Sequence, residues 1–392
     1  MSDHLPKGAE VVVIGAGAVG AACAYFLARE GFRVQVLEQG RVASGTSSAG
    51  EGNLLVSDKE AGHELDLALY SNSVWHDDLA EFGQLWEFES KGGFVVASSP
   101  EGADALRELG ARQRRAGIET VDVDAADIRQ YEPYIRSGLA AAAYYPQDAQ
   151  VQPMLLTAHL LRLARGMGAV ISTGIEVTGI EHHDLGGERR VKAVRTSRGT
   201  IACDHVVNAA GTWASEIAAM AGVDVPVLPR RGFVLVTEPL PPTINRKVYA
   251  GEYVASTQSS DESLQTSTVI EGTQAGTILI GSSRERVGFD RTVSLPVLRE
   301  IAAKALALFP SLARVRIMRT YMGFRPYCPD HLPVIGHDSR LTGMWHATGH
   351  EGAGIGLSVG TAKLLTQAMA GKSPDLDLSP FAPARFSAGD HA

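Results

Sequence analysis

Three glycines near the start of the chain could bring the backbone close to a phosphate group. Gly15, Gly17 and Gly20 have the spacing G-x-G-x-x-G, with Ala16 between the first two. The first permits a tight turn, the second lets the backbone approach a pyrophosphate without a Cβ clash, and the third lets a helix pack close to a strand. Free amides at the start of that helix would face the phosphates. The spacing therefore indicates a bound dinucleotide.

The flanking residues predict the elements that such a site needs. Val11–Ile14 is a β-branched run, Val19–Arg29 predicts a buried helix that ends before Gly31, and Arg33–Leu37 predicts a second strand. The segment from residue 11 to residue 28 has no charge and is long enough for a membrane span. The strand, glycine turn and helix within it favour a buried βαβ unit, so we expect no membrane span.

A carboxylate follows the second predicted strand. Glu38 lies 18 residues after Gly20, where its oxygens can accept hydrogen bonds from ribose hydroxyls, and Gln39 beside it is a further candidate contact. A negative charge here would repel a 2′-phosphate, which favours FAD or NAD over NADP. The glycines and Glu38 leave the choice between FAD and NAD open.

The segment Arg41–Asn53 is small, polar and rich in serine, threonine and glycine. These residues prefer turns and caps, although a second nucleotide-binding half would place a helix here. Such a segment could wrap a long ligand, which favours FAD, or could be an ordinary surface loop. The candidate cofactor contacts in and just after it are Ser44, Gly45, Thr46, Ser47, Gly52, Asn53 and Leu54.

Four further motifs follow along the chain. They are Gly174–Ile180, which predicts a strand, Val206–Trp213, Gly323–Gly336 and Thr348–Gly356, which leads into a terminal helix. Together with the N-terminal segments, they resemble the glycine oxidase/D-amino-acid dehydrogenase (DAO) family of FAD-dependent oxidoreductases over nearly the whole chain. The G-H-E-G-x-G-I and S-S-A-G-E-G-N sequences are most similar to the β subunits of D-hydroxyproline dehydrogenase and of opine oxidases.

The resemblance implies an α/β fold in which a Rossmann-like FAD-binding domain of the glutathione reductase type carries an α+β, mixed-sheet substrate domain. The FAD-binding domain would comprise residues 1–90, 150–220 and 320–392, and the substrate domain residues 91–149 and 221–319. The implied FAD contacts beyond the N-terminal segments are Val177, Ala209, Gly211, Trp213, Arg325, Gly352, Gly354, Ile355 and Gly356. We expect the residues after Gly371 to be extended or disordered.

The implied reaction is oxidation of a C–N bond. A hydride would move to flavin N5 from the α-carbon of a D-amino acid or cyclic imino acid, with D-hydroxyproline as the favoured substrate. Arg325 would clamp the substrate carboxylate with its guanidinium, and a surface salt bridge is its alternative role. Tyr253 or Tyr249 could add a hydroxyl, although packing explains either equally well. His350 could titrate near the flavin or the substrate, but a structural hydrogen bond is favoured.

Two positions bear on the flavin linkage and on the electron acceptor. Gly323 stands where relatives with covalent flavin carry a cysteine, and no histidine interrupts residues 44–52, so the resemblance implies non-covalent FAD. Leu279 stands at the aligned place of the lysine that assists the reaction with oxygen in sarcosine-type oxidases. This favours a dehydrogenase that passes electrons to an α subunit and an iron–sulfur subunit, or to another acceptor. The alternative is an oxidase of glycine, sarcosine or D-amino acids, or an opine oxidase subunit.

Functions of two other classes are weighed against this enzyme. A subunit in which FAD is only structural would have no need of an arginine clamp, and an NAD-dependent dehydrogenase would have no need of the loop after Glu38. The net charge of −8, from 36 Lys+Arg and 44 Asp+Glu, argues against nucleic-acid binding. Three scattered cysteines indicate no disulfide framework and a reducing, cytoplasmic location. His182–Asp184 is a polar cluster in an expected hairpin and indicates a solvated turn, so we expect no metal site.

Overall fold

The computed structural model describes residues 8–251, 253–254 and 259–386. Its first layer is a six-stranded sheet in the order β18-β19-β12-β1-β2-β8, in which β18 pairs antiparallel with β19 and the other pairs are parallel. The strands are β1 (Val11–Ile14), β2 (Val34–Glu38), β8 (Val170–Thr173), β12 (His205–Asn208), β18 (Val334–His337) and β19 (Met344–Thr348). All residues of β1 are buried, as expected for a strand that is covered on both faces.

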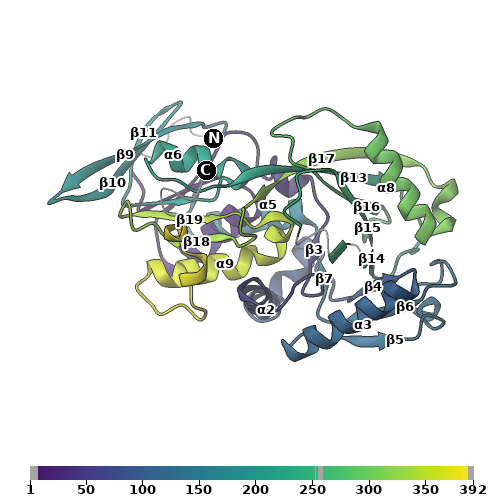
Figure 1. The fold of residues 1–392 in the computed structure, drawn as a ribbon. Coiled ribbons are helices and arrows are strands. Elements are labelled where there is room, and N and C mark those ends of the chain that lie inside the picture. The colour runs from purple at the N-terminus through teal and green to yellow at the C-terminus, as the bar shows by residue number, and fades with distance from the viewer. Residues whose placement is uncertain (1–7, 252, 255–258, 387–392) are drawn as a thin grey trace.

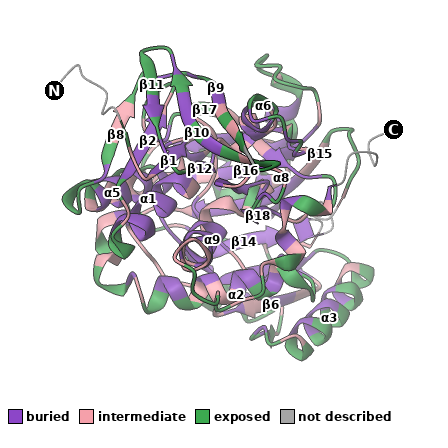
Figure 2. Cartoon of the chain, turned by 90° about the vertical axis from the view of Figure 1, so that its left-hand side faces the viewer, coloured by how far each residue is buried: buried purple, intermediate pink, exposed green. Residues whose placement is uncertain are grey.

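Helices cover this sheet. The first helix, α1 (Ala18–Glu30), packs against both α5 (Pro153–Gly166) and α9 (Gly354–Met369), and α2 (His63–His76) packs on α9. Most of α1 is buried (Figure 2). It ends at Gly31, whose left-handed φ of 103° lets its amide donate back to the last turn.

The second layer is an eight-stranded mixed sheet in the order β17-β13-β16-β15-β14-β4-β6-β5, in which β14 pairs parallel with β4. The strands are β4 (Gly93–Ala97), β5 (Val121–Val123), β6 (Ala141–Tyr145), β13 (Leu228–Thr237), β14 (Lys247–Ala250), β15 (Gln265–Gly272), β16 (Ile278–Arg284) and β17 (Ile317–Tyr327). Helix α8 (Leu295–Leu308) packs on β13, β15 and β16, and α3 (Pro100–Arg115) packs on β4 and β6. Figure 1 shows the long strands β13 and β17 side by side.

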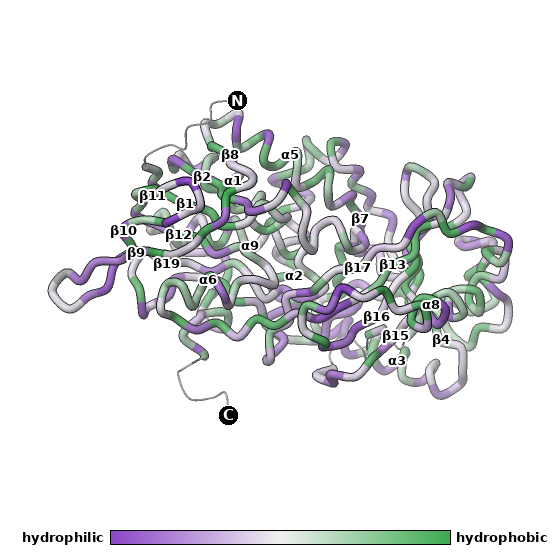
Figure 3. Tube along the Cα trace, turned by 90° about the horizontal axis from the view of Figure 1, so that it is seen from above, coloured by the Kyte–Doolittle hydropathy of each residue, from purple (hydrophilic) through white to green (hydrophobic). Residues whose placement is uncertain are grey.

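Smaller elements complete the chain. They are β3 (Asn53–Leu54) paired with β7 (Ala149–Gln150), the sheet of β9 (Val177–Leu185), β10 (Glu188–Thr196) and β11 (Gly199–Ala202), and the short helices α4 (Ile128–Tyr131) and α6 (Ala214–Met220). The β9–β10 hairpin projects from the body and is hydrophilic near its tip (Figure 3). It carries His182, His183 and Asp184. Among the residues described, no helix has the length and apolar character that a membrane crossing requires.

The structure confirms the α/β fold, and the predicted strand, helix and second strand at the N-terminus agree to within about a residue at each end. The strand expected from Gly174 begins only at Val177. The domain boundary expected at residue 320 falls inside β17, which belongs to the eight-stranded sheet. The remaining domain division stays a prediction.

The expectation of an extended or disordered C-terminal tail is wrong for residues 372–386. Phe381 is buried in the core of the first layer, and the Arg385 guanidinium forms an ion pair with Asp330 at 2.6 Å. These long-range contacts supply the order that the local sequence does not. Residues 387–392 lie outside the described part of the chain.

Candidate active site

A cavity of about 780 Å³ lies between the carboxyl ends of β1 and β2 and the strands β13 and β17. This is the edge of a parallel sheet where α/β folds bind ligands, and the volume is typical of cofactor sites. The predicted cofactor contacts that line it are Gly15, Gly17, Glu38, Gln39, Ser44, Gly45, Thr46, Ser47, Asn53, Val177, Ala209, Gly211, Trp213, Arg325, Gly352, Gly354 and Ile355. The structure thus brings distant motifs together around one space.

The glycine turn after β1 packs as its spacing predicts. A Cβ on Gly15 would lie 2.5 Å from the Ala209 carbonyl oxygen, and a Cβ on Gly20 would lie 2.0 Å from the Gly15 carbonyl oxygen. Both distances are far shorter than a van der Waals contact, so only glycine allows α1 to start this close to β12. The N-terminus of α1 therefore borders the cavity, where its dipole favours a pyrophosphate.

Glu38 is held by two backbone amides at the cavity wall. Its Oε2 accepts from Ala16 N at 2.9 Å, and its Oε1 accepts from Gly40 N at 2.7 Å. An ionised carboxylate has about four lone-pair positions, so it keeps acceptor capacity for ribose hydroxyls.

The serine-rich loop is fixed at both sides of the cavity. Ser47 Oγ accepts from Ala18 N at 2.9 Å, which ties the loop to the start of α1. Thr46 Oγ1 donates to the Phe324 carbonyl at 2.6 Å, and Thr212 Oγ1 donates to the same oxygen at 2.8 Å. This loop and the segment after β12 therefore meet on β17. The glycine turn, the N-terminus of α1 and the cavity volume fit a dinucleotide.

Five predicted contacts do not line this cavity: Ala16, Gly20, Gly52, Leu54 and Gly356. Gly52 shows one reason. A Cβ on Gly52 would lie 1.7 Å from the Val151 carbonyl oxygen, so close packing of two backbone segments explains this glycine. Leu54 and Gly356 line a smaller neighbouring cavity instead.

Arg325 is a residue of β17 that lines the cavity, and its side chain is held by a hydrogen bond to β16. Its Nη1 donates to the Ser283 carbonyl at 2.8 Å. Burial and the nearby Arg284 cation together lower the pKa of Arg325 to about 10, so the guanidinium stays charged at neutral pH. The remaining donors of the fork can bind a carboxylate. The alternative of a surface salt bridge is wrong.

The two tyrosines differ in position. Tyr253 lines the cavity, and Arg284 lies over its ring at 4.8 Å from the centroid. Burial raises the pKa of Tyr253, so its hydroxyl stays protonated near pH 7. Tyr249 instead donates to the Asp148 carboxylate and is fully buried, so of its two predicted roles the structure supports the buried one.

His350 lines the cavity but stays neutral. Its Nε2 forms a hydrogen bond with Thr361 Oγ1 at 2.9 Å inside the start of α9. Burial lowers the pKa of His350 to about 3. The geometry supports the structural hydrogen bond that the sequence favours, and the low pKa argues against the alternative of titration near neutrality.

Glu51 is a cavity residue that the sequence argument did not single out. It lies in the serine-rich loop, lines the same space as Arg325, and its Oε1 is buried without a hydrogen-bond partner. The only sign of it in the sequence is that Glu51, between Gly50 and Gly52, is a carboxylate within a run of small residues. Its importance depends on strands that are more than 200 residues away, which no local pattern reveals.

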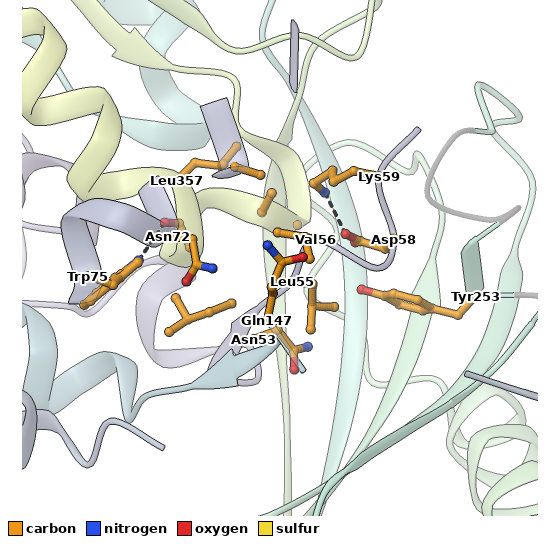
Figure 4. Close-up of a pocket in the computed structure, with 15 residues that line it drawn as sticks. Asn53, Leu55, Val56, Asp58, Lys59, Asn72, Trp75, Gln147, Tyr253 and Leu357 are labelled. Carbon is orange, nitrogen blue, oxygen red and sulfur yellow. Dashed lines mark hydrogen bonds and ion pairs between the residues drawn. The ribbon is translucent and has the colours of Figure 1, made fainter. Parts of the chain in front are cut away.

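A smaller cavity adjoins the large one through Asn53 and Tyr253 (Figure 4). Its walls include Leu55, Val56 and Trp75, and Trp75 Nε1 donates to the Gly356 carbonyl at 2.9 Å. The free volume of this smaller cavity is about 20 Å³, which is room for about one water molecule, so it adds little space for a substrate.

The described residues show no metal or thiol chemistry at the site. No group of three or more His, Cys, Asp or Glu side chains among them could hold a metal ion. Cys23, Cys203 and Cys328 are free and buried, and none of them lines the large cavity. A Cβ on Gly323 would lie 2.5 Å from the Ala49 Cβ, so the chain has no room for a side chain at the expected attachment position.

Comparisons with known proteins agree with this geometry. Residues 10–368 match the family model described as FAD dependent oxidoreductase (DAO). The hydrogen cyanide synthase subunit HcnC of Pseudomonas aeruginosa is 30% identical, over 96% of this chain and 96% of its own length. The structure of L-proline dehydrogenase from P. horikoshii matches with a TM-score of 0.87 at 26% identity, over 97% of this chain and 98% of that chain. Glycine oxidase from Geobacillus kaustophilus matches with a TM-score of 0.86 at 27% identity, over 98% of this chain and 100% of that chain.

Proposed function

Because the chain belongs to the DAO family of FAD-dependent oxidoreductases, we propose that it oxidises the C–N bond of a small amino or imino acid. The observation that carries this proposal is the charged Arg325 guanidinium, which faces the cavity with donors to spare. A guanidinium in this position fits a carboxylate bidentately and fixes the position of the α-carbon next to it.

FAD, when bound, supplies the hydride acceptor for this reaction. Glu38 and the start of α1 would hold its ribose and pyrophosphate, and the serine-rich loop would hold its middle part. Gly352, Gly354 and Ile355, at or just before the start of α9, border the same cavity, and the positive end of this helix favours negative charge there. The cavity wall lacks a cysteine, which supports non-covalent binding.

Two matched structures are named for enzymes that act on glycine and on L-proline, a primary and a secondary amine. Within this class we infer a D-amino acid or a cyclic imino acid, with D-hydroxyproline first, on the resemblance of the S-S-A-G-E-G-N and G-H-E-G-x-G-I sequences. An opine is the neighbouring alternative from the same resemblance.

We infer a dehydrogenase that passes electrons to a partner, with an oxygen-using oxidase as the alternative. The relative HcnC is named as a subunit, which is compatible with a partner chain such as an α subunit and an iron–sulfur subunit. Leu279 replaces the lysine of sarcosine-type oxidases, and Lys247 is fully buried in an ion pair with Glu271. The cytoplasmic location inferred from the sparse cysteines stays a prediction.

Absorbance spectroscopy under anaerobic conditions tests the function. The purified protein should show a flavin spectrum that bleaches when D-hydroxyproline or another member of an amino- and imino-acid panel is added. Arg325→Ala should keep a flavin spectrum, since many other residues contact FAD, and should lose the bleaching, because the substrate carboxylate loses its partner. A colourless protein, or a panel without any bleaching, would contradict the proposal. Rapid peroxide formation in air without an added acceptor would favour the oxidase.

A further inference from the structure

Glu51 places a carboxylate in the cavity, opposite in charge to Arg325. Glu51 lines the cavity, and its Oε1 is buried without a hydrogen-bond partner. A buried carboxylate oxygen without a partner is unfavourable, so its presence calls for a function. The bound ligand is the group that can supply the missing donor.

The same strand positions both charges. A Cβ on Gly281 of β16 would lie 1.9 Å from Glu51 Oε1, so a side chain at this position would displace the carboxylate. Two residues further along β16, the Ser283 carbonyl accepts the hydrogen bond from Arg325 Nη1. Glu51 and Arg325 therefore lie on neighbouring parts of one wall.

The two charges are close enough to interact but make no ion pair within 4.0 Å. Burial raises the pKa of Glu51, and the Arg325 cation opposes this rise. The remaining charged or titratable groups that act on or respond to Glu51 are Glu271, Lys247, Tyr253 and Tyr321. Lys247 is already paired with Glu271 at 2.9 Å, so it does not neutralise Glu51 directly.

We propose that Glu51 binds the amine of the substrate while Arg325 binds its carboxylate, and that Glu51 accepts one proton from the ammonium form. This inference rests on the proposed oxidation of an amino or imino acid. In the proton transfer, one N–H bond breaks, an O–H bond forms on Glu51, and the electron pair stays on nitrogen. That pair then forms the second C–N bond as the hydride leaves the α-carbon for FAD.

The arrangement selects a substrate class. A zwitterion places one negative and one positive group on the same small molecule, which matches a cation and an anion that are held apart on one wall. A simple carboxylate would leave Glu51 unpaired, and a simple amine would leave Arg325 unpaired. The site should therefore prefer α-amino and α-imino acids over either simpler class.

Calorimetric titration of the FAD-loaded protein tests the amine contact without turnover. The probes are 2-aminoisobutyrate and pivalate, which have nearly the same shape and lack an α-hydrogen, so neither can be oxidised. The native protein should prefer 2-aminoisobutyrate by at least about tenfold, and Glu51→Gln should reduce that preference by about ten- to one-hundredfold. The control Glu60→Gln changes an exposed carboxylate nine residues after Glu51, and it should leave the preference for 2-aminoisobutyrate unchanged.

Kinetics test the proton transfer. With Glu51→Gln, kcat/KM should rise with pH up to the pKa of the free substrate amine, since the enzyme can then use only the neutral amine. Glu51→Asp should give an intermediate binding preference, and it serves as the decisive variant if Glu51→Gln fails to retain FAD.

The outcomes separate the two proposals. If substrates bleach the flavin but both Glu51 variants keep the native preference for 2-aminoisobutyrate, the role of Glu51 is overturned and the function stands. If neither probe binds the native protein and no panel member bleaches it, the proposed function itself fails.

Discussion

The close contact at Gly20 gives a quantitative test of how α1 is positioned at the cofactor cavity. A Cβ on this residue would lie 2.0 Å from the Gly15 carbonyl oxygen, and that oxygen belongs to the backbone of the glycine turn. Neither group can rotate away, so Gly20→Ala must push α1 from β1 and β12. Overpacking of this kind costs about 1 to 3 kcal/mol.

A matched substitution isolates the clash. Gly166 is a helical glycine at the end of α5, and a Cβ there meets nothing within 4 Å. Gly166→Ala should stabilise the protein by up to about 1 kcal/mol, because alanine has the higher helix propensity. Gly20→Ala gains the same propensity but loses more through the clash, so its Tm should fall by a few degrees while that of Gly166→Ala does not.

The same displacement should weaken FAD binding, because the N-terminal amides of α1 border the cavity. A loss of about 1.4 kcal/mol corresponds to about a tenfold higher Kd for FAD. Thermal unfolding followed by flavin fluorescence, together with titration of FAD into the stripped protein, measures both effects. If the two alanine variants have the same Tm and the same Kd, the argument from close packing is refuted.

Three further predictions follow from buried groups. Lys247→Met should destabilise the protein by about 3 to 5 kcal/mol in urea unfolding, because it leaves the buried Glu271 carboxylate unpaired, and adding Glu271→Leu should recover part of this loss. His350, whose pKa is lowered to about 3, should make stability fall as the pH drops from about 6.5, by about 2 kcal/mol at pH 5, with no effect above pH 6.5. His350→Gln should flatten that part of the urea-midpoint profile, and an unchanged slope would count against the low pKa. Phe381→Ala should cost about 3 to 5 kcal/mol, whereas a disordered tail would give no change.

Local patterns predicted the parts of the site that local chemistry determines. The β-branched run, the glycine spacing and Glu38 lie within 28 residues of one another, and each predicts its own conformation. Arg325 was identified from a short motif by resemblance, and the structure brings it to the cavity. The C-terminal tail has no comparable pattern, and its order comes from the ion pair of Arg385 with Asp330.

Contacts between residues that are far apart in the sequence could not be predicted from local patterns. Tyr249 and Tyr253 were equal candidates in the sequence, but β14 buries Tyr249 against Asp148 while Tyr253 lies at the cavity. The role proposed for Glu51 depends on its contact with Gly281 of β16 and on the charge of Arg325 of β17. A single sequence contains no sign of which strand will face a given loop, so the buried charge could not be recognised from its neighbours.

The glycines at and near the cavity divide into two physical groups. Gly17 and Gly354 line the cavity, where the backbone can approach a ligand. Gly52 and Gly281 instead leave room for other parts of the protein, the Val151 carbonyl and the Glu51 carboxylate respectively. Substitution in the first group should therefore weaken FAD binding more than it lowers Tm. Gly52→Ala should lower Tm first, because its Cβ would lie 1.7 Å from backbone that no ligand can move.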